Sequence, residues 1–108
     1  MPVDWGQVGT DVESAVMKVL GSSWQTVATG ARPQLQAMIS IGQHIETSYA
    51  AHKLTEAEYK SLRAMQKRAL EGILSTYEAI GIVVAEQAAD AAWNVVSAAL
   101  LKAGVAFA

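Results

Sequence analysis

The sequence has no cysteine, two prolines and one phenylalanine among its 108 residues. The lack of cysteine excludes disulfides, thiol catalysis and thiolate metal sites. Charged residues make up 17% of the chain and the net charge is −2, so we expect no whole-surface attraction to nucleic acid or anionic lipid. Hydrophobic residues reach 52%, which argues against a disordered chain and is typical of a single globular domain, here residues 1–108.

The pattern of apolar residues predicts an all-α fold. No Asn-Gly or Asp-Gly hairpin dipeptide occurs, and β-branched residues never alternate over a sustained stretch. Helix starts are marked by a small polar residue followed three positions later by Glu or Gln, which is the capping-box pattern. These pairs are Asp4 with Gln7 (or, a turn later, Thr10 with Glu13), Ser22 with Gln25, and Thr55 with Glu58. We therefore predict helices over about 4–20, 22–52 and 55–103.

The middle predicted helix has a row of apolar and small residues spaced alternately by four and three, which we call the heptad seam. This spacing is typical of left-handed helix packing. Pro33 falls inside the pattern, directly after Gly30-Ala31-Arg32, and the seam stays in phase across it. We therefore predict a kink at Pro33 rather than a break. The seam consists of Trp24, Ala28, Ala31, Leu35, Met38, Gly42, Ile45, Tyr49 and His52.

The last predicted helix, over about 55–103, would be one rod of some 45 residues with an apolar surface too wide for a single neighbour. Only Lys53-Leu54 connects it to the middle helix, so the two should pair as an antiparallel hairpin. Small residues recur towards its end and would let another backbone approach closely. The predicted architecture is thus an antiparallel helical hairpin of two long helices plus a short N-terminal helix.

Such a hairpin leaves apolar area uncovered, so we expect homo-oligomers that form a helical bundle. A dimeric four-helix bundle is the simplest form, and a ring or larger array fits the same pattern. Basic residues fill the first half of the long rod and acidic residues the second, with Gly72 between them, so antiparallel copies would bring opposite charges together. A merely solvated polar stripe explains the same charges. The candidate interface residues are Trp24, Leu35, Met38, Gly42, Ile45, Tyr49, Gly72, Ala88, Ala92 and Ala99.

No motif for catalysis or for a cofactor is present. A carboxylate-bridged metal bundle needs Glu-x-x-His, and no glutamate has histidine three positions later. His44 and Glu46 lie two apart on a helix and project about 200° apart, so they cannot hold one ion together. Nucleophile-elbow and phosphate-loop patterns are also missing. We expect a non-enzymatic protein without metal or cofactor, in which His52 has a capping role or binds Glu56 or Glu58.

Two other partners are conceivable from the residues. Five basic residues between Lys53 and Arg68 lie beside Tyr59, but neighbouring glutamates dilute this patch, and we expect no direct binding to nucleic acid. The apolar segment Ala91 to Ala108 reaches the length of a bilayer span only by including Glu86 and Asp90. These two acidic residues disfavour a simple transmembrane helix. The alternative function is a membrane-active protein of pore or ejection type that uses this alanine-rich segment.

The chain start has neither a basic n-region nor an apolar h-region, so we expect no signal peptide. Its opening around Trp5, the turn Leu54-Thr55-x-x-Glu58 leading to Met65-Gln66-Lys67, and the segment Ala88 to Ala99 with its Gly104-Val105-Ala106-Phe107 ending resemble small alanine-rich helical proteins of bacteriophages. The resemblance implies a structural or assembly role, with a cytoplasmic or virion-associated location and another structural protein as a partner besides copies of the chain itself. It transfers no functional residues.

Overall fold

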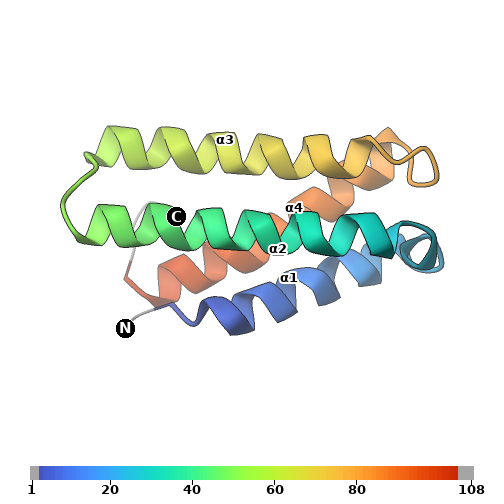
Figure 1. Cartoon of the computed structure of the whole chain (residues 1–108), viewed down its shortest axis with the longest axis horizontal. Helices are drawn as coiled ribbons and strands as arrows, with labels where there is room; N and C mark the ends of the chain where they lie inside the picture. The colour runs from blue at the N-terminus through green and yellow to red at the C-terminus, as the bar shows by residue number, and fades with distance from the viewer. Residues whose placement is uncertain (1–2, 105–108) are drawn as a thin grey trace.

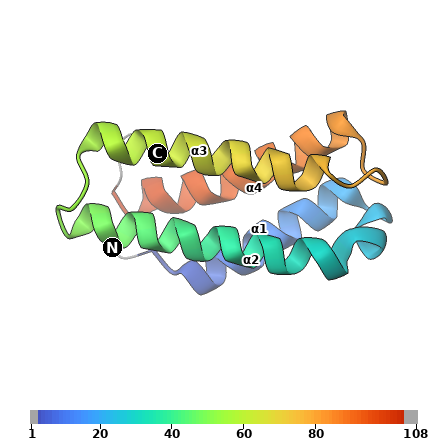
Figure 2. The same cartoon turned by 45° about the horizontal axis from the view of Figure 1, so that its top comes forward.

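The computed structural model describes residues 3–104, and this range forms four helices. They are α1 (Trp5–Leu20), α2 (Ser23–Ala50), α3 (Glu56–Ser75) and α4 (Ile82–Lys102). Successive helices run in opposite directions (Figure 1), and α2 and α3 form one layer with α1 and α4 behind it (Figure 2). Within residues 3–104, α1 and α3 each pack against α2 and α4, whereas the backbones of the diagonal pairs lie farther apart. The prediction of an all-α fold is confirmed, in the form of an up-and-down bundle measuring 41 × 22 × 20 Å.

Two of the three predicted caps form as expected. Asp4 accepts a hydrogen bond from the Gln7 backbone N–H at 3.1 Å. Thr55 and Glu58 form a complete capping box, in which the Thr55 side chain accepts from Glu58 N–H and the Glu58 carboxylate accepts from Thr55 N–H. Ser22 does stand at the N-cap of α2, but its side chain makes no cap hydrogen bond. The reason is its backbone, which is already helical at φ −63° and ψ −23°.

The rod predicted over about 55–103 is divided into α3 and α4 by the segment 76–81. The hydroxyl groups of Ser75 and Thr76 donate to carbonyl oxygens three residues back and so bind their own backbone at the end of α3. Gly81 then takes φ +80°, a conformation that glycine adopts without a steric penalty. Ile80 is buried and anchors the turn to the core. Residues 55–103 therefore do not form one straight rod, and the antiparallel pairing predicted for its basic and acidic halves cannot form in that way.

Helix α2 continues through Pro33 without interruption, so the break considered at this position does not occur. Its C-terminus is closed by His52, whose φ of +60° places it in the left-handed region. His52 N–H donates to Tyr49 O at 3.0 Å and Lys53 N–H donates to Ser48 O at 2.9 Å, which together form a Schellman motif. The predicted capping role of His52 is thus carried by its backbone.

The core is densest between α1 and α4. Valines from α1 meet alanines from α4, and the small side chains allow the two helices to lie close together. Seven alanine and valine positions of these two helices are at most 1% exposed, and these are Val12, Val16, Ala85, Ala88, Ala89, Ala92 and Val96. Among the described helices, none is both long and apolar enough to cross a membrane.

Candidate functional site

A polar cluster is buried at the end of the bundle where α1 starts and α2 ends. Arg63 and Gln66 of α3 are 6% and 3% exposed, and Tyr59 is fully covered. Glu46 approaches from α2 and the Trp5 ring from α1. Three helices therefore contribute side chains to one charged group in an otherwise apolar interior.

Arg63 is at the centre of this cluster. Its Nη2 donates to Glu46 Oε2 at 3.1 Å and its Nη1 donates to Gln66 Oε1 at 2.8 Å. Gln66 in turn donates to the Met38 carbonyl at 2.9 Å, which fixes α3 against the middle of α2. The guanidinium lies 5.6 Å from the centre of the Trp5 ring and 4.9 Å from that of Tyr59, both within cation–π distance. Arg63 Nε is buried and has no hydrogen-bond partner in the described part of the chain.

Tyr59 donates its hydroxyl hydrogen to the same Glu46 oxygen at 2.7 Å. Burial raises the pKa of Tyr59 from 10.0 to about 12, and the hydrogen bond to Glu46 acts in the same direction. Arg63 opposes the shift by favouring the phenolate. Because the folded chain holds this proton more tightly than the unfolded chain, Tyr59 supports folding below about pH 10 and loses that contribution as the pH rises towards 12.

This shift makes the contribution of Tyr59 measurable by comparing wild type with Tyr59→Phe in urea unfolding at pH 8 and pH 11. At pH 11 the unfolded chain gains by ionising Tyr59, whereas phenylalanine cannot ionise. We expect the stability difference between wild type and Tyr59→Phe to be about 1 kcal/mol smaller at pH 11 than at pH 8. An unchanged difference would contradict the burial of this hydroxyl.

Gly42 leaves the room that the cluster occupies. A Cβ placed on Gly42 would lie 2.7 Å from Gln66 Nε2, 3.2 Å from the Trp5 ring and 3.4 Å from Arg63 Nη1. The seam position that the sequence marks for close helix contact therefore accommodates polar side chains from α3 and the Trp5 ring from α1.

Replacing Gly42 by leucine should displace Gln66 and Trp5 together. We expect a loss of about 1–3 kcal/mol in the free energy of unfolding from overpacking, and a change in Trp5 fluorescence because the ring must move. Gln43→Leu is the matched control, since Gln43 is an exposed residue next to Gly42 on the same helix. Equal stability of Gly42→Leu and wild type would count against this packing.

Sequence reasoning missed the cluster because it grouped Arg63 with the patch of five basic residues between Lys53 and Arg68. The structure corrects this assignment: Arg63 and Tyr59 face the core, so neither belongs to the basic surface patch considered for nucleic acid. Lys60, another member of that patch, pairs with Glu56 at 3.2 Å. The available signal was spacing, since Tyr59, Arg63 and Leu70 share the periodicity of the buried face of α3.

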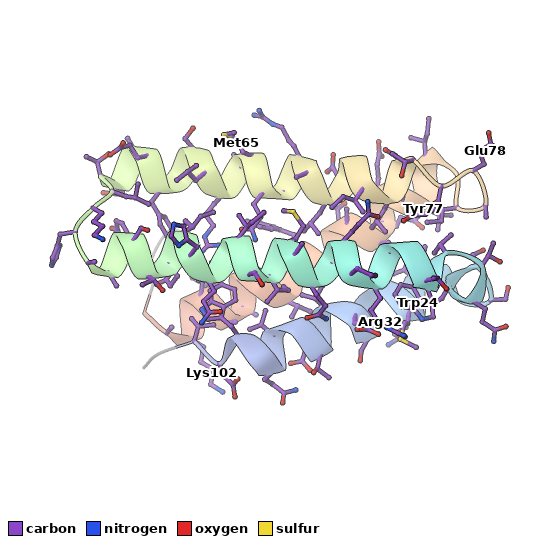
Figure 3. The ribbon with its side chains drawn as sticks, viewed as in Figure 1. Trp24, Arg32, Met65, Tyr77, Glu78 and Lys102 are labelled. Carbon is purple, nitrogen blue, oxygen red and sulfur yellow. The ribbon has the colours of Figure 1, made fainter. Side chains whose placement is uncertain are left out.

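A second feature is the surface shared by α2 and α3 on the side away from α1 and α4, which we call the outer face. At 100° per residue, it includes Ala37, Ile41, His44 and Ser48 from α2, and Leu62, Met65, Ala69 and Gly72 from α3. Ile41 is 49% exposed and Met65 is 58% exposed, and Met65 projects away from the bundle (Figure 3).

The outer face is hollowed between the two helices. A groove of about 500 Å³ runs there, lined mainly by apolar and small polar residues. Its only ionisable lining residue is His44. The lining residues are Ser40, Ile41, His44, Ile45, Ser48, Leu54 and Leu62.

The other sides of the bundle carry more charge. Helix α2 has only two acidic or basic residues, and both turn away from the outer face. Arg32 forms a 2.6 Å ion pair with Glu13 of α1, and Glu46 binds Arg63. A further groove of about 590 Å³ between the start of α1 and the end of α4 is bordered by Asp4, Asp11 and Lys102. The exposed large side chains of the outer face, Ile41 and Met65, lie within their helices, whereas the exposed Ile82, Val83 and Leu101 lie at the two ends of α4.

The candidate interface residues lie mostly inside the single chain. The seam prediction matches the burial of α2, because six of its nine members are buried and His52 is exposed. Tyr49 is half-buried and its ring centre lies 4.4 Å from that of Tyr59. Ala99 is half-buried and Gly72 is exposed. The fully covered candidates are Trp24, Leu35, Met38, Gly42, Ile45, Ala88 and Ala92, and their partners in this structure belong to the same chain.

Within residues 3–104, no group of three or more His, Cys, Asp and Glu side chains is arranged to hold a metal ion. No protein-family model, curated protein or solved structure matches this chain. The functional argument therefore depends on the geometry of the outer face and of the buried cluster.

Proposed function

We propose that this chain is a non-enzymatic structural protein that acts by associating with copies of itself through the outer face. The buried cluster makes the bundle a defined, rigid unit, and the outer face supplies the contact surface. The resemblance to bacteriophage proteins extends the proposal to a role in a larger assembly such as a virion, with a cytoplasmic or virion-associated location.

The observation that carries the proposal is the exposure of Ile41 and Met65 on a side of the bundle that lacks charge at its centre. Interface centres are depleted of charged residues and enriched in methionine and other large apolar side chains. Single exposed apolar residues are ordinary, but here Ile41 lines an apolar groove, and Met65 lies one helical turn from Leu62, which lines the same groove.

The size of the outer face also supports association. The bundle is 41 Å long and about 20 Å wide, so the outline of one side is about 800 Å², which is comparable to the surface that one subunit usually contributes to a stable interface. A second copy suits this surface because its centre, around Ile41 and Met65, carries no charge, so two copies bring no like charges together there.

Light scattering after size exclusion tests the proposal without any added partner. We expect a mass above the 11.4 kDa of one chain for the wild type, and a return to about 11.4 kDa for Ile41→Lys, which would place a charge at the centre of the contact. Ile82→Lys is the matched control, since Ile82 is 69% exposed and starts α4 outside the outer face. A wild-type monomer at all concentrations would overturn the proposal.

A further inference from the structure

We infer that two copies pair through their outer faces in an antiparallel, twofold-symmetric arrangement that closes as a dimer. This inference rests on the proposed function, because it specifies the geometry of the same surface. It depends on how the large and small residues are distributed along α2 and α3.

The outer face has two unlike halves. Ile41 and Met65 are its exposed large side chains, and both lie in the half nearer the α2–α3 connection. The hydrogen bond from Gln66 to Met38 sets the register of the two helices, so Ala37 and Ala69 lie near the middle. Beyond them the other half contains Pro33 and Gly72.

Gly72 has no explanation within a single chain. It lies inside α3, where glycine is less favourable than alanine by roughly 0.5–1 kcal/mol. A Cβ there would meet no described atom within 4 Å, so neither crowding nor backbone conformation in this chain requires glycine. An exposed glycine inside a helix leaves a shallow depression that a side chain of another molecule can fill.

The spacing brings the projecting and flat parts together. At 1.5 Å per residue, Met65 is about 6 Å from Ala69 towards the α2–α3 connection, and Gly72 is about 4.5 Å from Ala69 in the opposite direction. A twofold axis that lies in the plane of the contact, perpendicular to both helices and passing over Ala37 and Ala69, stacks each helix on the same helix of the partner. It therefore places Met65 of one copy over the partner's Gly72. A parallel pairing would instead place Ile41 against the partner's Met65 and leave the small halves apart.

This geometry also limits the size of the assembly. A twofold interface uses the same patch on both copies, so both outer faces are consumed and no free copy of the patch remains. The expected product is a dimer, so the mass should not exceed that of two chains at any concentration, in contrast to a ring or a filament.

Spin labels at the two ends of α2 test the orientation. The chain has no native cysteine, so Thr26→Cys and Ser48→Cys each give one labelled site, 11 residues to either side of Ala37. In the antiparallel dimer, label 26 lies about 33 Å along the axis from label 26 of the other copy. In a mixture of the two variants, label 26 lies beside label 48. Double electron–electron resonance measures both distances.

The outcomes are separable. A long distance between two labels at 26, with a short one between 26 and 48, supports the inference. A short distance between two labels at 26 would overturn the antiparallel arrangement while leaving self-association in place, and masses that grow beyond two copies would overturn the closed dimer. A monomeric chain would overturn the inference and the proposed function together.

Gly72→Trp provides a second test that does not depend on labels. Because the space above Gly72 is open, the midpoint of thermal unfolding of the monomer should change no more in Gly72→Trp than in the control variant Gln87→Trp on α4. The dimer dissociation constant should rise at least tenfold, since the indole would occupy the place of the partner's Met65. An unchanged dissociation constant would contradict the inferred contact.

Discussion

Replacing Ala92 by tryptophan is expected to remove a large fraction of the free energy of unfolding. Ala92 is fully covered, and it lies on the α4 surface that packs closely against the rest of the core. Overpacking costs about 1–3 kcal/mol for a few extra methylenes, and an indole adds far more volume than that. Circular dichroism and urea unfolding should show a loss above about 3 kcal/mol, a large fraction of the stability of a small domain.

Ala98→Trp is the matched control for this prediction, because Ala98 is an exposed alanine on the same helix. Its unfolding should resemble that of the wild type. The contrary result would be a folded Ala92→Trp chain that differs from wild type only by dissociating into monomers. That result would place the buried alanine side chains of α4 between copies rather than inside one chain.

Replacing Glu46 by alanine is expected to destabilise the fold by about 3 kcal/mol, because it leaves the buried Arg63 charge without its counter-ion. We expect the lower end of the range for buried pairs, since the Glu46 side chain is 21% exposed whereas that of Arg63 is 7% exposed. The Tyr59 hydroxyl loses its acceptor in the same variant. Urea unfolding at neutral pH measures the change.

Two controls separate charge from other effects in this experiment. Glu46→Gln keeps an oxygen acceptor for Tyr59 and Arg63 but removes the charge, so its cost should be smaller than that of alanine. Glu13→Ala breaks the ion pair with Arg32, whose side chain is 54% exposed, and should cost less than about 1 kcal/mol. Equal losses for Glu46→Ala and Glu13→Ala would show that Arg63 is solvated rather than buried.

The local features of the fold were predictable from sequence because they depend on neighbouring residues. The Thr55–Glu58 capping box requires only four consecutive positions, and the Asp4 cap likewise. The buried positions of α2 follow from the four-and-three spacing of the seam. The uninterrupted helix across Pro33 also agrees with a seam that stays in phase there.

Long-range features were not predictable in the same way. The end of α3 depends on hydroxyls of Ser75 and Thr76 turning back on the backbone and on Gly81 adopting a positive φ. Neither signal outweighs a continuous apolar periodicity over 55–103 when residues are considered one helix at a time. The turn lets α4 return along α1. The alanines of α4 are therefore buried in the core of the same chain.

The candidate site shows the same limitation. A sequence pattern records Arg63 as a charge, whereas its burial depends on Glu46 and Trp5 from two other helices. Conversely, Met65 is apolar and was expected on the covered side of the rod, yet it is 58% exposed. The outer face emerged only when α2 and α3 were placed side by side.

The most direct test of self-association through the outer face is the oxidation rate of Met65 by dilute hydrogen peroxide, followed by mass spectrometry at low and high protein concentration. In a single chain Met65 is 58% exposed and Met17, outside the outer face, is 40% exposed, so Met65 should react at least as fast as Met17 in dilute protein. The proposal predicts that Met65 becomes several-fold slower than Met17 at high concentration, where the outer face is covered. Met65 reacting as fast as Met17 at every concentration would contradict it.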